Sequence, residues 1–434
     1  MNDSPKSLRA FFIIWTGQAF SLLGSSLVQF ALVWWLTAST GSATVLATAT
    51  MVAILPGIVI GPFAGTLVDR WSRRWVMVVA DAVIALTTLW AAFLAWNGLL
   101  QPWHVYVIMF VRATAGGFHW PAMQASTSLM VPERLLSRVA GLNQTLYGLM
   151  QIAAPALGAL LLSVSALPVI LMIDVVTAAM AITPLLFIDV PQPPRQQLVE
   201  GAVAKPSVVA DLISGVRYVL KWPGLLMLMA MAMIINFVVN PAFSLMPILV
   251  IRNFNGGVGH LGALESALGI GMVLGGLVLS AWGGFRRRLL TSLAGLIGMG
   301  LGVLAMGLAP QTAFVLAVGA IFLVGFMNPI VNGPVFAVMQ ATVAPEMQGR
   351  VFTLLQSAAS AMSPLSLAVA GPVSDAIGVQ AWYIVGGLVC VLMGIGGFFV
   401  PALVHMEDNH QTNVPASDTP LVPVGIDSRQ DQAL

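Results

Sequence analysis

Four ionisable side chains stand inside long apolar segments, where they have the greatest capacity for chemistry: Asp81, Arg112, Asp174 and Glu265. Placing such a group at the centre of a membrane-spanning helix costs roughly 2.5–3.5 kcal/mol, so it is usually paired or functional. One interpretation makes one carboxylate a proton carrier, whose protonation changes with burial and with the approach of Arg112. The other treats the groups as fixed ion pairs between helices. Fixed pairing is favoured for Asp81 and Asp174, and neither interpretation is favoured for Arg112.

Uncharged polar side chains form a second set, spaced so that they share helix faces. One face of the first apolar segment carries four of them, at positions that follow the 3.6-residue period of a helix. Two later segments each carry a pair of asparagines four residues apart. Such groups either line a cavity for a hydrogen-bonding ligand or bond a neighbouring helix, and both interpretations stay open. The set comprises Gln18, Ser21, Ser25, Gln29, Asn236, Asn240, Asn328 and Asn332, with His119 as a further cavity candidate.

A short segment after the second apolar run combines glycine, acid and arginine: Gly65-Thr-Leu-Val-Asp69-Arg70-Trp-Ser-Arg73-Arg74. The Asp69 carboxylate can accept hydrogen bonds from the free N–H groups at a helix N-terminus, or pair with the adjacent arginines. The glycine lets a neighbouring helix approach closely. We interpret this segment as a latch that opens and closes during a conformational change. The alternative is that its arginines only orient the chain in a membrane.

Other classes of chemistry find no support in the sequence. None of the three lysines follows a glycine, so the chain has no phosphate-binding Gly-Lys loop for ATP hydrolysis. The five histidines lack metal-ligand spacing, and no nucleophile–base set is recognisable. A single cysteine, Cys390, excludes an intrachain disulfide. The net charge is +2 and the basic residues form no common face. We therefore expect no enzyme activity, no cofactor, no metal site and no nucleic-acid partner.

The composition indicates that the apolar segments carrying these groups lie in a lipid bilayer and not in water. Of the 434 residues, 58% are hydrophobic and only 8% are charged, with a mean hydropathy of +0.93, whereas soluble domains carry about 25% charged residues. A spanning helix needs about 20 apolar residues, and residues 10–68 and 289–345 lack charged side chains entirely. The sequence therefore predicts an all-α polytopic membrane protein. Its twelve expected spans are 10–37, 44–68, 75–97, 103–125, 139–162, 168–189, 224–250, 262–282, 289–309, 312–338, 350–373 and 381–404.

The basic residues predict the orientation of these spans. If the spans alternate in direction, sixteen of the eighteen lysines and arginines fall on one side. Arg252 alone falls on the other side, and Arg112 lies within a span. Because basic loops stay in the cytoplasm, both termini and the central loop are expected there, in a multi-pass protein of the cell membrane. The apolar segment that begins at Ala10 is too long for a signal peptide, so we expect it to remain as the first helix.

An internal repeat divides the spans into two halves. Pro132-Glu133 with Arg138-Val139 recurs 213 residues later as Pro345-Glu346 with Arg350-Val351, with one residue dropped. Two six-helix halves related in this way place a substrate path between them, near the bilayer midplane. The expected divisions are an N-terminal half (1–190), a cytoplasmic central loop with a short amphipathic surface helix (191–223), a C-terminal half (224–405) and a disordered tail (406–434).

Twelve spans in two halves, together with the Gly65–Arg74 segment, resemble the major facilitator superfamily. Arg112-Ala-Thr-Ala-Gly116 is similar to the intramembrane Arg-x-x-x-Gly motif of that superfamily. Ala154-Pro155-Ala-Leu-Gly158 is similar to the Gly-Pro-x-x-Gly motif of its exporters. The run from Gly17-Gln18 through Trp34-Trp35-Leu36, with Asp174, is similar to the macrolide-efflux branch.

The resemblance implies a secondary active transporter that works by alternating access, with spans one, four, seven and ten around a central cavity. It also implies proton antiport and export of a hydrophobic or amphipathic small molecule by a monomer, with macrolides as the named possibility. Ser72 and Ala154 stand where the motifs usually have glycine. Uptake or facilitated diffusion is therefore the first alternative. A membrane sensor is the second, although the central loop and tail leave little room for an output module.

Overall fold

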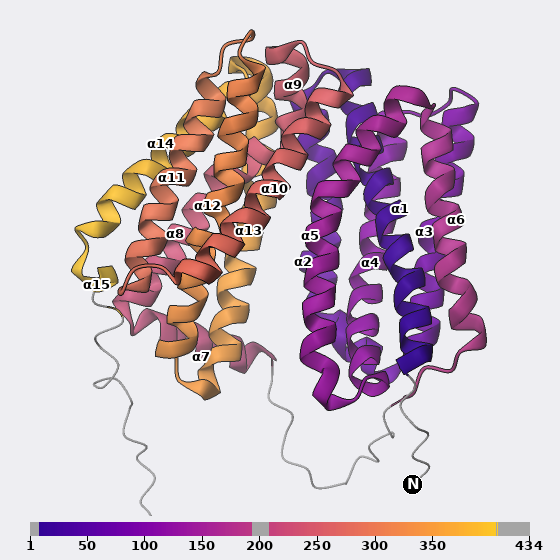
Figure 1. Cartoon of the computed structure of the whole chain (residues 1–434), viewed down its shortest axis with the longest axis horizontal. Coiled ribbons are helices and arrows are strands. Elements are labelled where there is room, and N and C mark those ends of the chain that lie inside the picture. The colour runs from indigo at the N-terminus through magenta and orange to yellow at the C-terminus, as the bar shows by residue number, and fades with distance from the viewer. Residues whose placement is uncertain (1–7, 193–207, 405, 407–434) are drawn as a thin grey trace, which may run out of the picture.

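The computed structural model describes residues 8–192, 208–404 and 406, which fold into two bundles of long helices (Figure 1). The first bundle, called the N-terminal half, comprises α1 (Leu8–Thr40), α2 (Ala43–Arg70), α3 (Arg73–Trp96), α4 (Pro102–Met130), α5 (Glu133–Val164) and α6 (Leu167–Phe187). The second, called the C-terminal half, comprises α8 (Pro223–Ser244), α9 (Met246–Phe254), α10 (Val258–Trp282), α11 (Arg288–Leu308), α12 (Phe314–Thr342), α13 (Pro345–Ile377), α14 (Gln380–Phe398) and α15 (Pro401–Val404). Between them in the chain, α7 (Val208–Leu220) packs against α8 and α13.

Eleven of the described helices are long and apolar enough to cross a membrane: α1, α2, α3, α5, α6, α8 and α10 to α14. The helix α4 does not reach the same hydropathy, because it carries Arg112 and two histidines along its length. Its 29 residues nevertheless give a helix of about 43 Å at 1.5 Å per residue, which exceeds the hydrocarbon thickness of a bilayer. The all-α polytopic architecture predicted from the sequence is confirmed.

Successive long helices run in opposite directions within each half (Figure 1), so the molecule has two distinct ends. One end carries the start of α1, the loop between α2 and α3, and α7; we call it the α7 end (Figure 1). The opposite end carries α9 and the start of α2, and we call it the α9 end.

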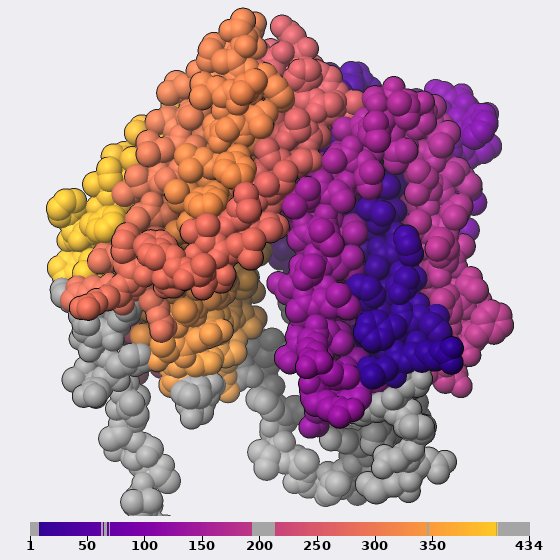
Figure 2. All heavy atoms as spheres, viewed as in Figure 1, coloured from indigo at the N-terminus to yellow at the C-terminus, as the bar shows by residue number. Residues whose placement is uncertain are grey.

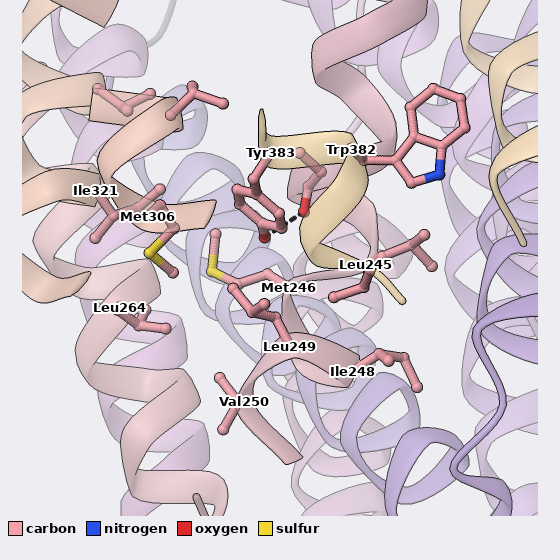
Figure 3. Packing of buried hydrophobic residues seen from close by; sticks show 14 of the residues in the cluster. Leu245, Met246, Ile248, Leu249, Val250, Leu264, Met306, Ile321, Trp382 and Tyr383 are labelled. Carbon is pink, nitrogen blue, oxygen red and sulfur yellow. Dashed lines mark hydrogen bonds between the residues drawn. The ribbon is translucent and has the colours of Figure 1, made fainter. Parts of the chain in front are cut away.

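The seventh expected span, 224–250, is not one helix, because α8 and α9 are separated at Leu245, where φ is −98° and ψ is 9°. Pro247 lacks the N–H group that a continuous helix would need there. The Tyr383 hydroxyl of α14 donates to the Ala242 carbonyl at 2.5 Å and satisfies an acceptor at the end of α8 (Figure 3). The last expected span, 381–404, is likewise divided between α14 and α15.

The break between α8 and α9 is held in a hydrophobic core of the C-terminal half (Figure 3). Leu249 of α9, Leu264 of α10, Met306 of α11 and Ile321 of α12 are all completely or almost completely buried in this cluster. Burial of a side chain of this size contributes about 1.5–3 kcal/mol. The short helix α9 is therefore anchored to the C-terminal half.

Glycines bring α1 and α6 into close contact within the N-terminal half. A Cβ atom on Gly17 would lie 2.9 Å from the Met180 carbonyl oxygen, and a Cβ atom on Gly24 would overlap the Thr177 hydroxyl. Any larger side chain at Gly24 would therefore separate the two helices. This approach allows polar groups of α1 to reach α6 in the interior of the half.

The two halves meet chiefly along two helix pairs, α2 with α13 and α5 with α10. At the first crossing, a Cβ atom on Gly371 would lie 2.8 Å from the Cα atom of Thr44 and 3.0 Å from the Cβ atom of Ala47. Because Thr44 and Ala47 belong to the first turns of α2, this crossing closes the α9 end. Toward the α7 end the molecule is hollowed between the halves (Figure 2).

Some sequence predictions lie outside the described residues. They concern segment 193–207 of the central loop and the tail from residue 407 onward. The backbones of Gly65 and Asp69 belong to α2, but the placement of their side chains also lies outside what the structure describes.

Candidate functional site

A cavity of about 720 Å³ lies between the two halves, and we call it the central cavity. Its size is in the range of small-molecule sites. Helices α1 to α5 supply most of its wall, and the C-terminal half adds residues of α8, α9 and α10. The structure brings nine of the predicted site residues together in this wall: Gln18, Ser21, Ser25, Gln29, Asp81, Arg112, His119, Pro155 and Glu265.

Arg112 and Asp174 form an ion pair in the interior of the N-terminal half. The Arg112 guanidinium donates to a carboxylate oxygen of Asp174 at 2.5 Å, and the Asp174 side chain is completely buried. The Ser25 hydroxyl donates to the other carboxylate oxygen at 3.0 Å. The same guanidinium reaches the Ser25 carbonyl at 3.3 Å. The pair therefore joins α1, α4 and α6.

Thr88 completes this network, and the sequence interpretation missed it. Its hydroxyl, which is fully buried, donates to Asp174 at 2.8 Å and also lies in hydrogen-bond contact with Arg112. Thr88 follows Asp81 by seven residues, which is close to two helical turns. A polar residue two turns from a buried acid was the signal that would have identified it.

Asp81 forms a second polar cluster, closer to the α7 end. Its carboxylate accepts a hydrogen bond from the Gln18 amide at 2.9 Å, and its other oxygen lies 3.4 Å from Nε2 of His119. Asp81 is nearly buried yet contributes to the wall of the central cavity. A carboxylate beside an imidazole can exchange a proton with it or with water in the cavity.

Glu265 differs from the other intramembrane acids. Among the described residues, none forms a hydrogen bond or an ion pair with its carboxylate. It lines the central cavity and also a small adjoining pocket of about 160 Å³ beside Gln151, Pro155 and Met246. Glu265 therefore lies where α10 of one half faces α5 of the other, without a neutralising partner in the described part of the chain.

The four predicted asparagines lie elsewhere, in a second cavity of about 240 Å³ within the C-terminal half. The Asn240 amide donates to Ser363 of α13 at 2.6 Å and to Asn236 at 3.1 Å. The Asn332 amide donates to the Asn328 carbonyl at 3.0 Å. The expectation that these side chains line a cavity thus agrees with the geometry, but this cavity is not the one that α1 lines.

The arginines of the loop motif bind carbonyl groups at the α7 end. Arg73 donates to the Ala125 carbonyl of α4 at 2.8 Å. Arg74 donates to the Leu185 carbonyl near the end of α6 and pairs with Asp189, both at 2.5 Å. Cations at the C-terminal end of a helix are stabilised by its dipole. These contacts fasten the start of α3 to α4 and α6, while Arg70 is exposed.

The predicted exporter-like motif lies where α5 faces both α1 and α10. A Cβ atom on Gly158 would lie 2.6 Å from the ring of Phe30 on α1. Pro155 lines the central cavity, and its carbonyl oxygen would lie 3.0 Å from a Cβ atom on Gly262 of α10. The motif therefore sits at a close contact between the halves.

Asp375, near the end of α13, holds the α9 end closed, and the sequence interpretation missed this residue. Its carboxylate accepts hydrogen bonds of 2.7–2.9 Å from the Ser42 and Thr44 hydroxyls and from the backbone N–H groups of Ala43 and Thr44. Arg252 of α9 adds an ion pair at 2.7 Å. Asp375 thus clamps the N-terminus of α2, in one half, to α13 and α9 in the other.

Comparison with known proteins agrees with the resemblance drawn from the motifs. The family model described as Major Facilitator Superfamily matches residues 14–367. Macrolide efflux protein A of Streptococcus pyogenes is 34% identical over 386 residues, which cover 89% of this chain and 94% of the relative. Multidrug efflux pump Tap of Mycolicibacterium fortuitum is 28% identical over 397 residues, which cover 88% of this chain and 94% of that protein.

Solved structures of other transporters share the fold. The nucleoside transporter NupG has a TM-score of 0.61 at 16% identity, with coverage of 88% of this chain and 97% of NupG. A D-xylose-proton symporter has a TM-score of 0.63 at 12% identity, with coverage of 88% and 96% respectively. At these identities the likeness concerns the arrangement of helices alone.

Proposed function

Because the chain belongs to the major facilitator superfamily, we propose that it is a proton-coupled exporter of hydrophobic or amphipathic small molecules, with macrolides among its substrates. The observation that carries this proposal is the 720 Å³ central cavity, closed at the α9 end and bordered by ionisable groups of both halves. The relatives named for macrolide and multidrug efflux support the substrate class. Their matches extend over nearly the whole chain.

The α7 end faces the cytoplasm of the cell in this proposal. The supporting observation is the concentration of basic residues at that end, including Arg73 and Arg74 at the start of α3 and Arg286 to Arg288 at the start of α11. The structure then corresponds to an inward-open state, in which a substrate enters the central cavity from the cytoplasm or the inner leaflet. Export requires the halves to separate at the α9 end and to approach at the α7 end.

Proton coupling is assigned to the carboxylates that reach the central cavity, Asp81 and Glu265. The Asp174 carboxylate is unsuited to this role, because Arg112, Thr88 and Ser25 already occupy both of its oxygens. A proton on Glu265 would neutralise an acid that has no partner in the described part of the chain. Release of that proton toward the cytoplasm would restore the charge, and this cycle can be coupled to the movement of the halves.

The remaining site residues take the roles that their positions allow. Gln18, Ser21, Ser25 and Gln29 would contact the substrate together with His119, because all five line the central cavity. Asp69 would close the α7 end in the outward-open state, either by accepting hydrogen bonds from a helix N-terminus or by pairing with the adjacent arginines, as the latch interpretation of the loop motif has it. The cavity is complete within one chain, which supports a functional monomer.

Transport into inside-out membrane vesicles tests this function. We expect radiolabelled erythromycin to accumulate when the vesicle interior is acidified and to be lost when an uncoupler is added. Vesicles that contain the Glu265→Gln variant provide the matched control for coupling. If erythromycin only reaches equal concentrations on both sides, with or without the proton gradient, antiport would be contradicted and facilitated diffusion favoured. Facilitated diffusion is the alternative left open by Ala154, which stands in place of the motif glycine.

A further inference from the structure

The second cavity lies inside the C-terminal half and is distinct from the central cavity. Four helices enclose it, α8, α11, α12 and α13, with Leu403 of α15 adding to its wall. At about 240 Å³ it is smaller than the roughly 300–1,000 Å³ of a complete drug site. It is large enough for one part of an amphipathic molecule.

The chemistry of this cavity is uncharged throughout. None of its described lining residues is acidic or basic. Its polar groups are the four asparagines, Gln356 and Ser292, and its apolar groups include Met231, Met299 and Phe336. A charged ligand group would lose its hydration there without finding a counter-charge, whereas hydroxyl, ether and carbonyl groups would find amide partners.

Several of these polar groups have hydrogen-bonding atoms that no described residue uses. The Ser292 hydroxyl is buried and has no hydrogen-bond partner there. The Asn240 and Asn332 side chains use their amide N–H groups in the bonds given above, which leaves their carbonyl oxygens without a donor. Buried polar groups are usually hydrogen-bonded, so the unpartnered Ser292 hydroxyl points to a hydrogen-bonding ligand in the cavity. Asn240 is half-buried and Asn332 is exposed, and their carbonyl oxygens offer further acceptors to such a ligand.

We propose that the cavity inside the C-terminal half is a subsite for the uncharged, oxygen-rich part of an amphipathic substrate, such as a glycosyl or lactone group. This inference rests on the proposed export function and names the half that recognises the substrate. Phe243 lies between the two compartments, because it lines both cavities. A substrate that spans them places its uncharged part among the asparagines and its remainder in the central cavity, while the charges of the N-terminal half serve coupling.

Binding of erythromycin, a macrolide rich in hydroxyl and ether groups, to the purified full-length chain in lipid nanodiscs tests the proposal. The Ala359→Phe variant fills the subsite, because Ala359 lines it. We expect at least a tenfold weaker affinity for this variant. The matched control is Ala263→Phe, the same change at an exposed position of α10 outside both cavities, which should bind as the wild type does. Equal thermal unfolding temperatures of the two variants show that folding is preserved.

Protection from chemical labelling gives an independent readout. In a Cys390→Ser background, erythromycin should slow modification of Asn332→Cys, which is exposed and lines the subsite, at least tenfold. It should not slow modification of Ser280→Cys, which is exposed on α10 away from both cavities. Erythromycin binding to wild type with neither effect would overturn the subsite and leave the export function intact. Failure of the wild type to bind erythromycin or transport it in vesicles would overturn the subsite together with the proposed substrate class.

Discussion

The clamp at the α9 end predicts that Asp375→Asn shifts the protein toward the outward-open state. The substitution keeps the size of the side chain and removes the charge that accepts four hydrogen bonds from the start of α2 and the ion pair from Arg252. Each hydrogen bond to a charged group is worth about 1.5–3 kcal/mol. When the halves separate at the α9 end, however, all these groups regain hydrogen bonds to water. The free energy of opening is therefore smaller than the sum of the individual bonds.

The ion pair between Arg252 and Asp375 contributes little to the free energy that keeps the α9 end closed. The Arg252 side chain is 40% exposed and that of Asp375 is 27% exposed, and exposed pairs are weak. The backbone N–H groups of α2 account for most of the effect, since they lose a charged acceptor at a helix N-terminus. We expect a net change of about 2 kcal/mol in favour of opening, which corresponds to a ~30-fold rise in the ratio of outward-open to inward-open protein.

The assay is labelling of intact cells with a membrane-impermeant thiol reagent. The probe is Val33→Cys in a Cys390→Ser background, because Val33 lines the central cavity and is reached from outside only when the α9 end opens. The Asp375→Asn substitution should accelerate its labelling by about the factor given above. The control is Asp189→Asn, which removes the partner of Arg74 at the α7 end within one half and should leave the rate unchanged. Equal rates in both variants would refute the clamp.

Three further predictions concern the polar groups within the membrane. Asp174→Asn should lower the free energy of unfolding by about 3–5 kcal/mol, because it strands the buried Arg112 guanidinium; thermal unfolding in detergent measures this, and a loss no larger than that of Ser21→Ala would argue against a structural pair. Glu265→Gln should abolish uphill accumulation of erythromycin while retaining exchange between equal concentrations, and undiminished accumulation would remove Glu265 from the coupling step. Asp69→Asn should impair transport with normal membrane insertion, and normal transport would reduce the loop motif to an orientation signal.

The sequence predicted those parts of the fold that depend on composition and periodicity. Long apolar runs identify spanning helices because the bilayer leaves few alternatives, so the all-α architecture followed directly. The intramembrane charges Asp81, Arg112 and Asp174 drew attention because isolated charges are costly there, and the structure places all three in hydrogen-bonded clusters. Which acid pairs with the arginine depends on helix packing, which one sequence does not reveal.

Other features depended on contacts between distant segments. The break at Leu245 and the seating of α9 follow from packing against α10, α12 and α14, although Pro241 and Pro247 marked the region as a site of interruption. The partner of the lone Arg252 is 123 residues away in the chain. An aspartate in the last turn of a helix opposes the helix dipole, and this anomaly was the one local sign of the role of Asp375.

The polar stripes illustrate the limit of helix periodicity. Spacing of 3.6 residues grouped Gln18, Ser21, Ser25 and Gln29 on one face of α1, and all four line the central cavity. The same argument paired Asn236 with Asn240 but did not show that they face a separate cavity. Which space a helix face borders is decided by the neighbouring helices, and so by tertiary structure.

Simultaneous measurement of drug and proton movement by the purified chain tests the central claim most directly. In proteoliposomes with an acidic interior and a fluorescent pH indicator, we expect erythromycin to accumulate inside while protons leave, both at rates proportional to the amount of protein. Glu265→Gln should abolish the drug-dependent proton flux. Accumulation of the drug without any proton movement, or proton movement that does not depend on the drug, would contradict the account of this chain as a proton-coupled exporter.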